Sequence, residues 1–200
     1  GDPVLVHEAA VKVVVAPRKD PVSVFSFMSS EVSAERPKEL TVAAVAEGMA
    51  ECRREGKRIL FVGGPAIIHT GAGRYLETLI ANGWIDVLFA GNALATHDIE
   101  AALLGTSLGV RLSAGAPVAT GHNHHLRAIN TIRAAGSIRA AVEKGILRSG
   151  VMHACIVHNV DYVLAGSIRD DGPLPDVITD VVRAQDEMRA RVRDVGLALM

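Results

Sequence analysis

The sequence predicts an α/β domain built on a parallel sheet with helices between its strands. Three short apolar runs share one pattern: RILFVGG (58–64), IDVLFAGN (85–92) and VDYVLAGS (160–167) each end in small residues that polar residues follow. Stretches with helical periodicity separate these runs, and parallel neighbouring strands need a covering connection of this kind. The composition agrees, because 49% of the 200 residues are hydrophobic but only 4% are aromatic. We therefore expect a core of Ala, Val, Leu and Ile.

The remaining elements are predicted from periodicity and from Gly and Pro positions. The Val-rich stretch 4–17 has the pattern of one or two strands, and the Pro- and Ser-containing stretch that follows has that of a linker. We expect residues 1–36 to be a β segment and linker left from an upstream domain, and residues 37–200 to form the α/β domain. Helices are predicted over 40–55, 72–82, 96–104, 124–135, 137–144 and about 176–195, with glycines at 56, 83 and 105 placed to end three of them.

Two further segments shape the expected organisation. Residues 106–121 form the one long irregular stretch inside the domain, and loops of that length are often functional. The chain ends at VGLALM without a helix stop signal. We expect the sequence to be the middle of a longer polypeptide, truncated at its C-terminal side.

Charge and cysteine content exclude several classes of function. The formal net charge is −1 and the basic residues are spread along the chain, which argues against nucleic acid or anionic lipid as a partner. Cys52 and Cys155 are far apart and form no CxxC motif, so neither a disulfide framework nor a thiolate zinc site is indicated. No apolar run approaches the roughly 18–20 residues of a membrane-spanning helix. A small polar metabolite, bound in the cytoplasm, is the expected partner.

Candidate binding residues follow the predicted strands, because ligands bind beyond the carboxyl ends of the strands in open parallel sheets. Gly63 and Gly64 permit close approach of a ligand to the backbone, although glycines needed only for turns explain them equally well. Gly91 and Asn92 end the second apolar run, and the Asn92 carboxamide can donate to and accept from a ribose or a nicotinamide.

The beginning of the next predicted helix has two interpretations. Thr96 can cap this helix and Asp98 can complement its dipole, which would make both residues structural. The alternative is a functional role for either residue at the candidate site.

A polar turn follows the third apolar run. Arg169, Asp170 and Asp171 lie between it and the last predicted helix. Acidic side chains at such a position commonly bind ribose hydroxyls, and an arginine there can pair with a carboxylate or phosphate. The Asp-Asp-Gly-Pro sequence is also favourable turn chemistry without any ligand.

Three histidines crowd into GHNHH, residues 121–125, before a predicted helix. A zinc site needs three or four ligands in a defined geometry, and neither HExxH nor CxxC accompanies His122, His124 and His125. We therefore predict no metal. Imidazoles that hydrogen-bond a substrate carboxylate, or that act as acid and base, fit this cluster better, and a surface or interface role stays open.

Five stretches together resemble a known family. They are FMSSEVSAERP, GGPAIIHTGAG, VLFAGNALATHDIEAALLGTSLGV, GHNHHLRAINTIRAAGSI and YVLAGSIRDDGPLPDVITDV, which cover most of residues 25–182. The family is the conserved domain named after the bifunctional enzyme lysine-oxoglutarate reductase/saccharopine dehydrogenase (LOR/SDH). It includes archaeal NAD-dependent ornithine cyclodeaminases and the C-terminal part of cyanobacterial arginine dihydrolase/ornithine cyclodeaminase.

The resemblance implies a three-layer, Rossmann-like NAD-binding domain of the deoxyhypusine synthase type. It implies NAD bound at Asn92 and Ala93 and at the turn of Asp170 and Asp171, with further contacts from a segment that follows the end of this chain. The implied reaction is hydride removal from ornithine, cyclisation with loss of ammonia, and hydride return to give proline, which makes the protein a cyclising ammonia-lyase.

The site roles that this reaction requires are assigned as hypotheses. A proton-transfer carboxylate is needed, and Asp98 or Asp170 would supply it. Arg169 would hold the substrate carboxylate, and His122 and His124 would help to orient the amino-acid substrate.

Three other functions compete with this one. They are another NAD-dependent amino-acid dehydrogenase, a transferase of the deoxyhypusine synthase type, and a non-catalytic NAD-binding module of a larger assembly. In each case the apolar surplus and the Ala- and Val-rich helices favour a homo-oligomer.

Overall fold

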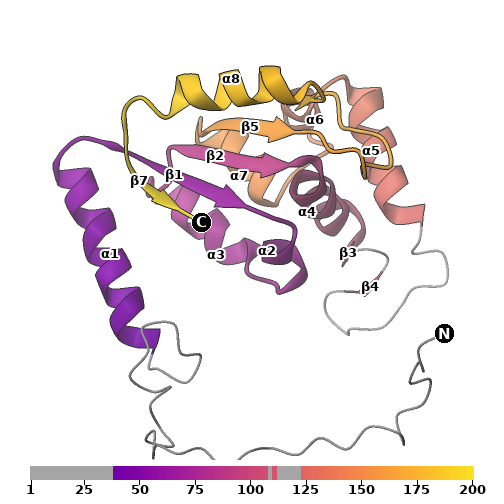
Figure 1. The fold of residues 1–200 in the computed structure, drawn as a ribbon. Coiled ribbons are helices and arrows are strands. Elements are labelled where there is room, and N and C mark those ends of the chain that lie inside the picture. The colour runs from indigo at the N-terminus through magenta and orange to yellow at the C-terminus, as the bar shows by residue number, and fades with distance from the viewer. Residues whose placement is uncertain (1–37, 108–109, 112–122) are drawn as a thin grey trace, which may run out of the picture. The chain divides into compact units, whose positions relative to one another are not determined.

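A computed structural model describes residues 38–107, 110–111 and 123–200 (Figure 1). The chain divides into two compact units, Gly1–Ala43 and Ala44–Met200. Helix α1 (Lys38–Arg54) begins in the first unit and ends in the second, which contains all the other described elements. The strands predicted near the N-terminus lie outside the described residues.

The second unit is organised by a parallel five-stranded sheet in the order β6-β5-β2-β1-β7. The three predicted apolar runs are confirmed as its central strands. Phe61 of β1 pairs with Leu88 of β2, and Leu88 pairs in turn with Tyr162 of β5. The strands are β1 (Arg58–Gly63), β2 (Val87–Gly91), β5 (Asp161–Ala165), β6 (Val177–Ile178) and β7 (Val195–Leu199).

Helices cover both faces of this sheet, which confirms the predicted three-layer arrangement (Figure 1). Helix α8 lies on one face, and the larger hydrophobic core lies on the other face, beneath α3, α4 and α7. Two antiparallel strands of two residues each, β3 (Thr106–Ser107) and β4 (Val110–Arg111), follow α4. The helices are α2 (Ala66–His69), α3 (Gly73–Ala81), α4 (Asn92–Leu104), α5 (His124–Ala135), α6 (Ile138–Glu143), α7 (Val151–Val157) and α8 (Val181–Arg191).

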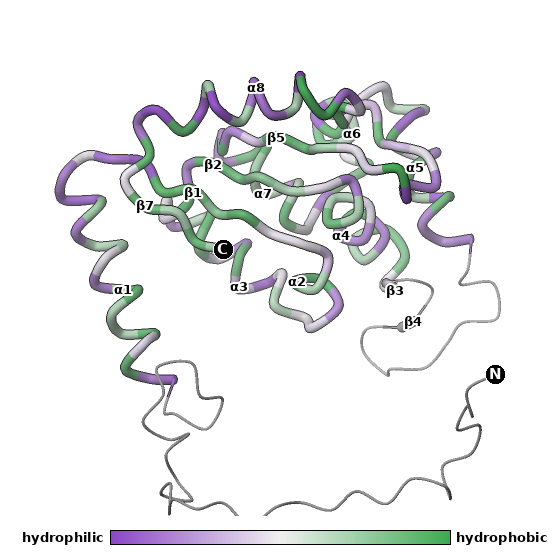
Figure 2. Tube along the Cα trace, in the orientation of Figure 1, coloured by the Kyte–Doolittle hydropathy of each residue, from purple (hydrophilic) through white to green (hydrophobic). Residues whose placement is uncertain are grey.

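The central residues of the three apolar runs are buried, and those of β2 are buried on both faces of the sheet. In β2, Leu88 and Ala90 belong to the larger core, whereas Val87 and Phe89 belong to a smaller cluster under Met188 of α8. A strand covered on both sides reads as a continuous hydrophobic run rather than an alternating one. Figure 2 shows this contrast, because β1 and β2 are largely hydrophobic whereas α8 is mostly hydrophilic.

Three predicted boundaries are wrong. The last helix spans Val181–Arg191 and not 176–195, because Val177–Ile178 and Val195–Leu199 pair as edge strands at opposite sides of the sheet. The final VGLALM segment is therefore sheet. Helix α4 begins at Asn92 rather than at Thr96, so Thr96 is an interior helical residue and not a cap.

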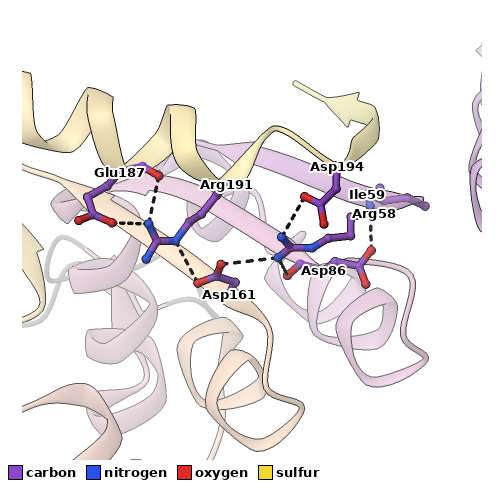
Figure 3. Close-up of polar contacts among 7 residues, drawn as sticks. All are labelled: Arg58, Ile59, Asp86, Asp161, Glu187, Arg191 and Asp194. Atoms are coloured by element: carbon purple, nitrogen blue, oxygen red, sulfur yellow. Dashed lines mark hydrogen bonds and ion pairs between the residues drawn. The ribbon is translucent and has the colours of Figure 1, made fainter. Parts of the chain in front are cut away.

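Ion pairs and a backbone hydrogen bond join the amino ends of four parallel strands (Figure 3). Arg58 reaches Asp161 at 3.6 Å and Asp194 at 3.3 Å, and Arg191 of α8 reaches Asp161 at 3.1 Å. The Asp86 carboxylate accepts a hydrogen bond from the Ile59 backbone N–H at 2.7 Å. These contacts hold α8 and β7 against the central strands, at the sheet edge opposite to the predicted site.

Candidate functional site

The start of α4 and the turn after β5 form one small pocket. Asn92, at the start of α4, and Asp171, in the turn after β5, both line it. Its volume is about 90 Å³, and because a water molecule occupies roughly 30 Å³, it accommodates part of a ligand rather than a whole dinucleotide. The lining residues are Asn92, Ala93, Thr96, His97, His125, Ile129, Arg169, Asp170 and Asp171.

Asn92 joins the two sides of this pocket. Asn92 is 4% exposed, and its Oδ1 accepts hydrogen bonds from the Leu174 backbone N–H at 3.0 Å and from the Thr96 hydroxyl at 3.3 Å. Among the described residues the Asn92 Nδ2 group has no hydrogen-bond partner. The carboxamide oxygen is therefore used to fix the turn, and the amide nitrogen is left for a ligand in the pocket.

The N-terminus of α4 also favours an anionic group. The N-cap residue is Gly91, and no side chain caps the helix there. The first backbone N–H groups of a helix have no partner within it, and together with the helix dipole they bind phosphate readily. Ala93 follows in the first turn and contributes only a methyl group to the pocket wall.

Gly63 and Gly64 lie at the carboxyl end of β1, beside β2, but they do not line this pocket. A Cβ at Gly63 would lie 2.9 Å from Cδ1 of Leu94, so the close packing of α4 against β1 requires a glycine there. A Cβ at Gly64 would meet nothing within 4 Å. Packing alone thus accounts for Gly63, and Gly64 borders open space.

The acidic turn combines turn chemistry with exposed charge. Asp170 Oδ2 accepts a hydrogen bond from the Ser167 backbone N–H at 2.8 Å, which closes the turn. Asp171 Oδ2 lies 3.0 Å from His125 Nε2, and its carboxylate is 71% exposed. Arg169 is exposed beside them. The structure therefore brings the three predicted turn residues together with Asn92 and Ala93.

A buried polar network lies behind the pocket. His97 Nδ1 is 3.3 Å from Glu100 Oε2, and the Thr106 hydroxyl donates to Glu100 Oε1 at 2.8 Å. The same hydroxyl is 2.8 Å from His124 Nδ1. Glu100 is fully buried. The predicted site residue His124 is thus linked through Thr106 and Glu100 to His97, which lines the pocket.

A second histidine flanks this network. The rings of His69 and His97 are tilted against each other with their centroids 4.9 Å apart, and His69 Nδ1 is 2.8 Å from the Ser107 hydroxyl. Burial, and then the neighbouring His97, lower the pKa of His69 below its usual value. His69 therefore favours its neutral form.

Asp98 lies apart from the other predicted site residues. Its carboxylate accepts backbone N–H bonds at 2.8 Å from Val151 and Met152, at the start of α7. It borders a different pocket, of about 220 Å³, together with Glu77 and Gly150. Burial raises the pKa of Asp98 to about 7, although the two backbone donors act in the opposite direction. The contacts of Asp98 are those of a group that supports α7.

The remaining predicted histidine, His122, lies outside the described residues. Within the described part of the chain, no three His, Cys, Asp or Glu side chains are placed to hold a metal ion. No helix there is long and apolar enough to cross a membrane. The described histidines of the GHNHH motif have protein partners instead, since His124 contacts Thr106 and His125 contacts Asp171.

The sequence reasoning missed two residues, His97 of the pocket and Glu100 of the network, and it considered His125 only as a member of the GHNHH cluster. His97 and Glu100 are three positions apart on α4, a spacing that places two helical side chains beside each other. That signal is present in THDIE, residues 96–100. It carries weight only once Thr106 and His124 are known to complete the chain of hydrogen bonds.

Sequence comparisons assign both parts of the chain. The family profile described as "Arginine dihydrolase ArgZ-like, C-terminal, Rossmann fold" matches residues 43–200, and that described as "Arginine dihydrolase ArgZ-like, C-terminal, first region" matches residues 1–42. The chain is 55% identical to an ornithine cyclodeaminase of Methanothermobacter thermautotrophicus, covering 100% of this chain and 49% of that protein. It is 49% identical to the bifunctional arginine dihydrolase/ornithine cyclodeaminase AgrE of Nostoc sp., and the match covers 88% of this chain and 25% of that protein.

Solved structures agree with this assignment. A conserved LOR/SDH protein from Methanococcus maripaludis superposes with a TM-score of 0.81 at 55% identity, covering 84% of this chain and 53% of that one. The ternary complex of AgrE with ornithine and NAD⁺ superposes with a TM-score of 0.80 at 48% identity, and the match covers 84% of this chain and 25% of that one. The chain spans about half the length of the curated archaeal relatives that it matches, which include those of Methanothermobacter and Methanocaldococcus at 49% each.

Proposed function

Because the chain belongs to the family of ArgZ-like C-terminal domains, we propose that it is the NAD-binding part of an ornithine cyclodeaminase, which converts L-ornithine to L-proline and ammonia. The observation that carries the proposal is the shared pocket of Asn92 and Asp171 at the carboxyl ends of β2 and β5. Relatives named ornithine cyclodeaminase at 55% identity support the choice of reaction, and the AgrE complex with ornithine and NAD⁺ supports the choice of ligands.

The residues of the pocket fit a dinucleotide. The uncapped N-terminus of α4 at Gly91 suits its phosphates, and Asn92 Nδ2 is left without a protein partner in the described residues. The exposed Asp171 carboxylate suits a ribose hydroxyl. The small Ala93 side chain lets the cofactor approach the backbone. When bound, NAD supplies a hydride acceptor for the α-carbon of ornithine and later a hydride donor.

The chain's own residues would bind and orient the amino acid. Arg169 is an exposed guanidinium on the pocket rim, and it would pair with the substrate carboxylate. Asp170 would hold the turn in shape through the hydrogen bond that it accepts from the Ser167 backbone N–H. His124 would help to orient the substrate indirectly, through its hydrogen bond with Thr106. Asp98 would support α7 rather than transfer protons, because its carboxylate is engaged by backbone donors away from this pocket.

The proposal is tested with the whole protein that carries this sequence. We expect it to bind NAD, measured by isothermal titration, and to form proline and ammonia from ornithine without lasting NADH absorbance. The Asn92→Ala variant should lose NAD affinity, whereas Asn82→Ala should not, because Asn82 is an exposed residue that bonds only its own helix. Net NADH accumulation would indicate a dehydrogenase, and NAD binding without turnover would indicate a non-catalytic module.

Three broader features belong to the same proposal. The family profiles meet at residues 42 and 43, which supports a division of the chain near the predicted boundary at residue 36. Both cysteines are buried free thiols, as is usual in the cytoplasm. Exposed Val181 and Val182 on α8 support a homo-oligomer, which light scattering of the purified protein would test.

A further inference from the structure

His97 is a pocket residue to which the resemblance assigns no role. Its side chain is 11% exposed, and it lines the pocket together with Asn92 and Asp171. Its Nδ1 atom faces the buried carboxylate of Glu100 at 3.3 Å. An imidazole at a ligand pocket with a carboxylate behind it is the arrangement that general acid–base catalysis uses.

The hydrogen bonds determine which nitrogen of His97 carries the proton. The Thr106 hydroxyl has one proton, and it donates that proton to Glu100 Oε1, so it must accept from His124 Nδ1. With Glu100 ionised, its carboxylate accepts hydrogen bonds only, and Glu100 then accepts from His97 Nδ1 as well. His97 is left with a lone pair on Nε2, which is the ring nitrogen available to a group in the pocket.

The network also fixes the orientation of the His97 ring. Glu100 is fully buried, and Thr106 is 2% exposed. Two anchored neighbours, Glu100 on one side and the tilted ring of His69 on the other, restrict the rotation of the imidazole. A proton-transfer group needs such a fixed geometry, because misplacement of the reacting atoms sharply lowers the rate.

From this geometry we propose that His97 is the catalytic base and acid of the cyclodeaminase reaction, with Glu100, Thr106 and His124 as positioning residues. The inference rests on the proposed function. His97 Nε2 takes a proton from an ammonium group of ornithine. The N–H bond breaks, its electron pair stays on the amine nitrogen, and the imidazole becomes imidazolium. The imidazolium returns a proton to the nitrogen that leaves as ammonia, which restores neutral His97 and balances the cycle.

Several charged and titratable groups face the His97 ring and its pocket. The described groups that surround the ring or the pocket are His69 of α2, Glu100 of α4, His125 of α5, and Arg169, Asp170 and Asp171 of the turn.

The test compares His97→Ala, His97→Gln and Glu100→Gln in the whole protein with NAD and ornithine. We expect kcat to fall by about 10²–10⁴-fold in both His97 variants. KM for ornithine and Kd for NAD should change much less than kcat, because the Asn92, Arg169 and Asp171 side chains that are proposed to bind these ligands stay in place. Added imidazole should restore part of the activity of His97→Ala, which a merely structural defect would not allow. The limb of the pH–rate profile that reports this base should disappear in His97→Gln.

The positioning role makes a separate prediction. Glu100→Gln should lower kcat and move the pH–rate profile while NAD binding persists, because a neutral amide no longer selects the Nδ1-protonated form. His158→Ala is the matched control, since His158 is exposed at the end of α7 and should keep the wild-type rate. His97→Gln, which retains a donor toward Glu100, serves if His97→Ala does not fold.

Each negative outcome has its own meaning. A wild-type protein that binds NAD but forms no proline overturns the proposed function together with the role of His97. An active wild type whose His97→Gln variant keeps its kcat and pH profile overturns the role of His97 alone. Loss of activity in His97→Ala without imidazole rescue, joined to loss of NAD binding, would also overturn it in favour of a structural histidine.

Discussion

Gly150→Ala should be among the most destabilising small substitutions in this chain. Gly150 precedes α7 with φ of +98°, and a Cβ built there would lie 2.8 Å from both carboxylate oxygens of Asp98. Those oxygens accept the Val151 and Met152 backbone N–H groups at 2.8 Å. The new methyl group would therefore displace a buried carboxylate from the two donors that it satisfies.

The magnitude follows from two contributions. A non-glycine residue in a glycine-only backbone region costs about 1–3 kcal/mol. A buried donor left without an acceptor costs about 1–3 kcal/mol more. We expect the free energy of unfolding to fall by about 2–6 kcal/mol in Gly150→Ala if one of the two N–H groups loses its acceptor. Gly136→Ala is the matched control, because its φ is +103° and its Cβ would meet nothing within 4 Å.

Urea unfolding followed by circular dichroism measures both costs, and a double-mutant cycle isolates the contact. Asp98→Ala removes the obstacle, so Gly150→Ala should cost only about 1–3 kcal/mol in that background. Equal losses for Gly150→Ala and Gly136→Ala in the wild-type background, with no coupling to Asp98, would refute the reasoning.

Two further predictions concern charge. The pKa of Asp98 is about 7 in the folded protein against 3.8 for an ordinary aspartate. The protonated side chain therefore contributes its full stabilisation below pH 3.8, and this contribution is lost as the pH rises through 7. At ~1.4 kcal/mol per pKa unit, the free energy of unfolding falls by about 4 kcal/mol over this range. Urea midpoints between pH 4 and 8 should therefore fall more steeply for the wild type than for Asp98→Asn, and parallel curves would contradict this. Arg58→Met should lower the free energy of unfolding by about 1 kcal/mol in dilute buffer and by less in 1 M salt, because its ion pairs with Asp161 and Asp194 are partly exposed.

The central strands were predictable because buried strands consist of continuous runs of apolar residues, which can be recognised in the sequence. Val87, Leu88, Phe89 and Ala90 are all buried, and a strand that is covered on both faces is apolar at every position. The edge strands β6 and β7 carry no such signal. Val177–Ile178 pairs on one side only and is two residues long, and Val195–Leu199 alternates between half-buried and exposed positions.

The backbone part of the candidate site was predictable for a related reason. Parallel strands place their carboxyl ends at one edge of the sheet, so the residues after β2 and β5 converge whatever their side chains do. Asn92 and Asp171 line the same pocket because they follow neighbouring parallel strands. The partners of their side chains did not follow, because the bonds from Asn92 to Leu174 and from Asp171 to His125 depend on how the turn folds back over α4 and α5.

The side-chain part of the site depends on where α4 begins. Asn92, Ala93, Thr96 and His97 share one helix face only if the helix already includes Asn92, and Asp98 then points about 100° further round the axis, toward α7. A helix that starts at Thr96 separates Asn92 from that face and makes Asp98 a first-turn residue. The sequence favours the later start because Thr is a good cap, whereas the structure starts at Asn92 because its side chain binds Thr96 within the helix and Leu174 outside it. The same four-residue difference moves the candidate for proton transfer from Asp98 to His97.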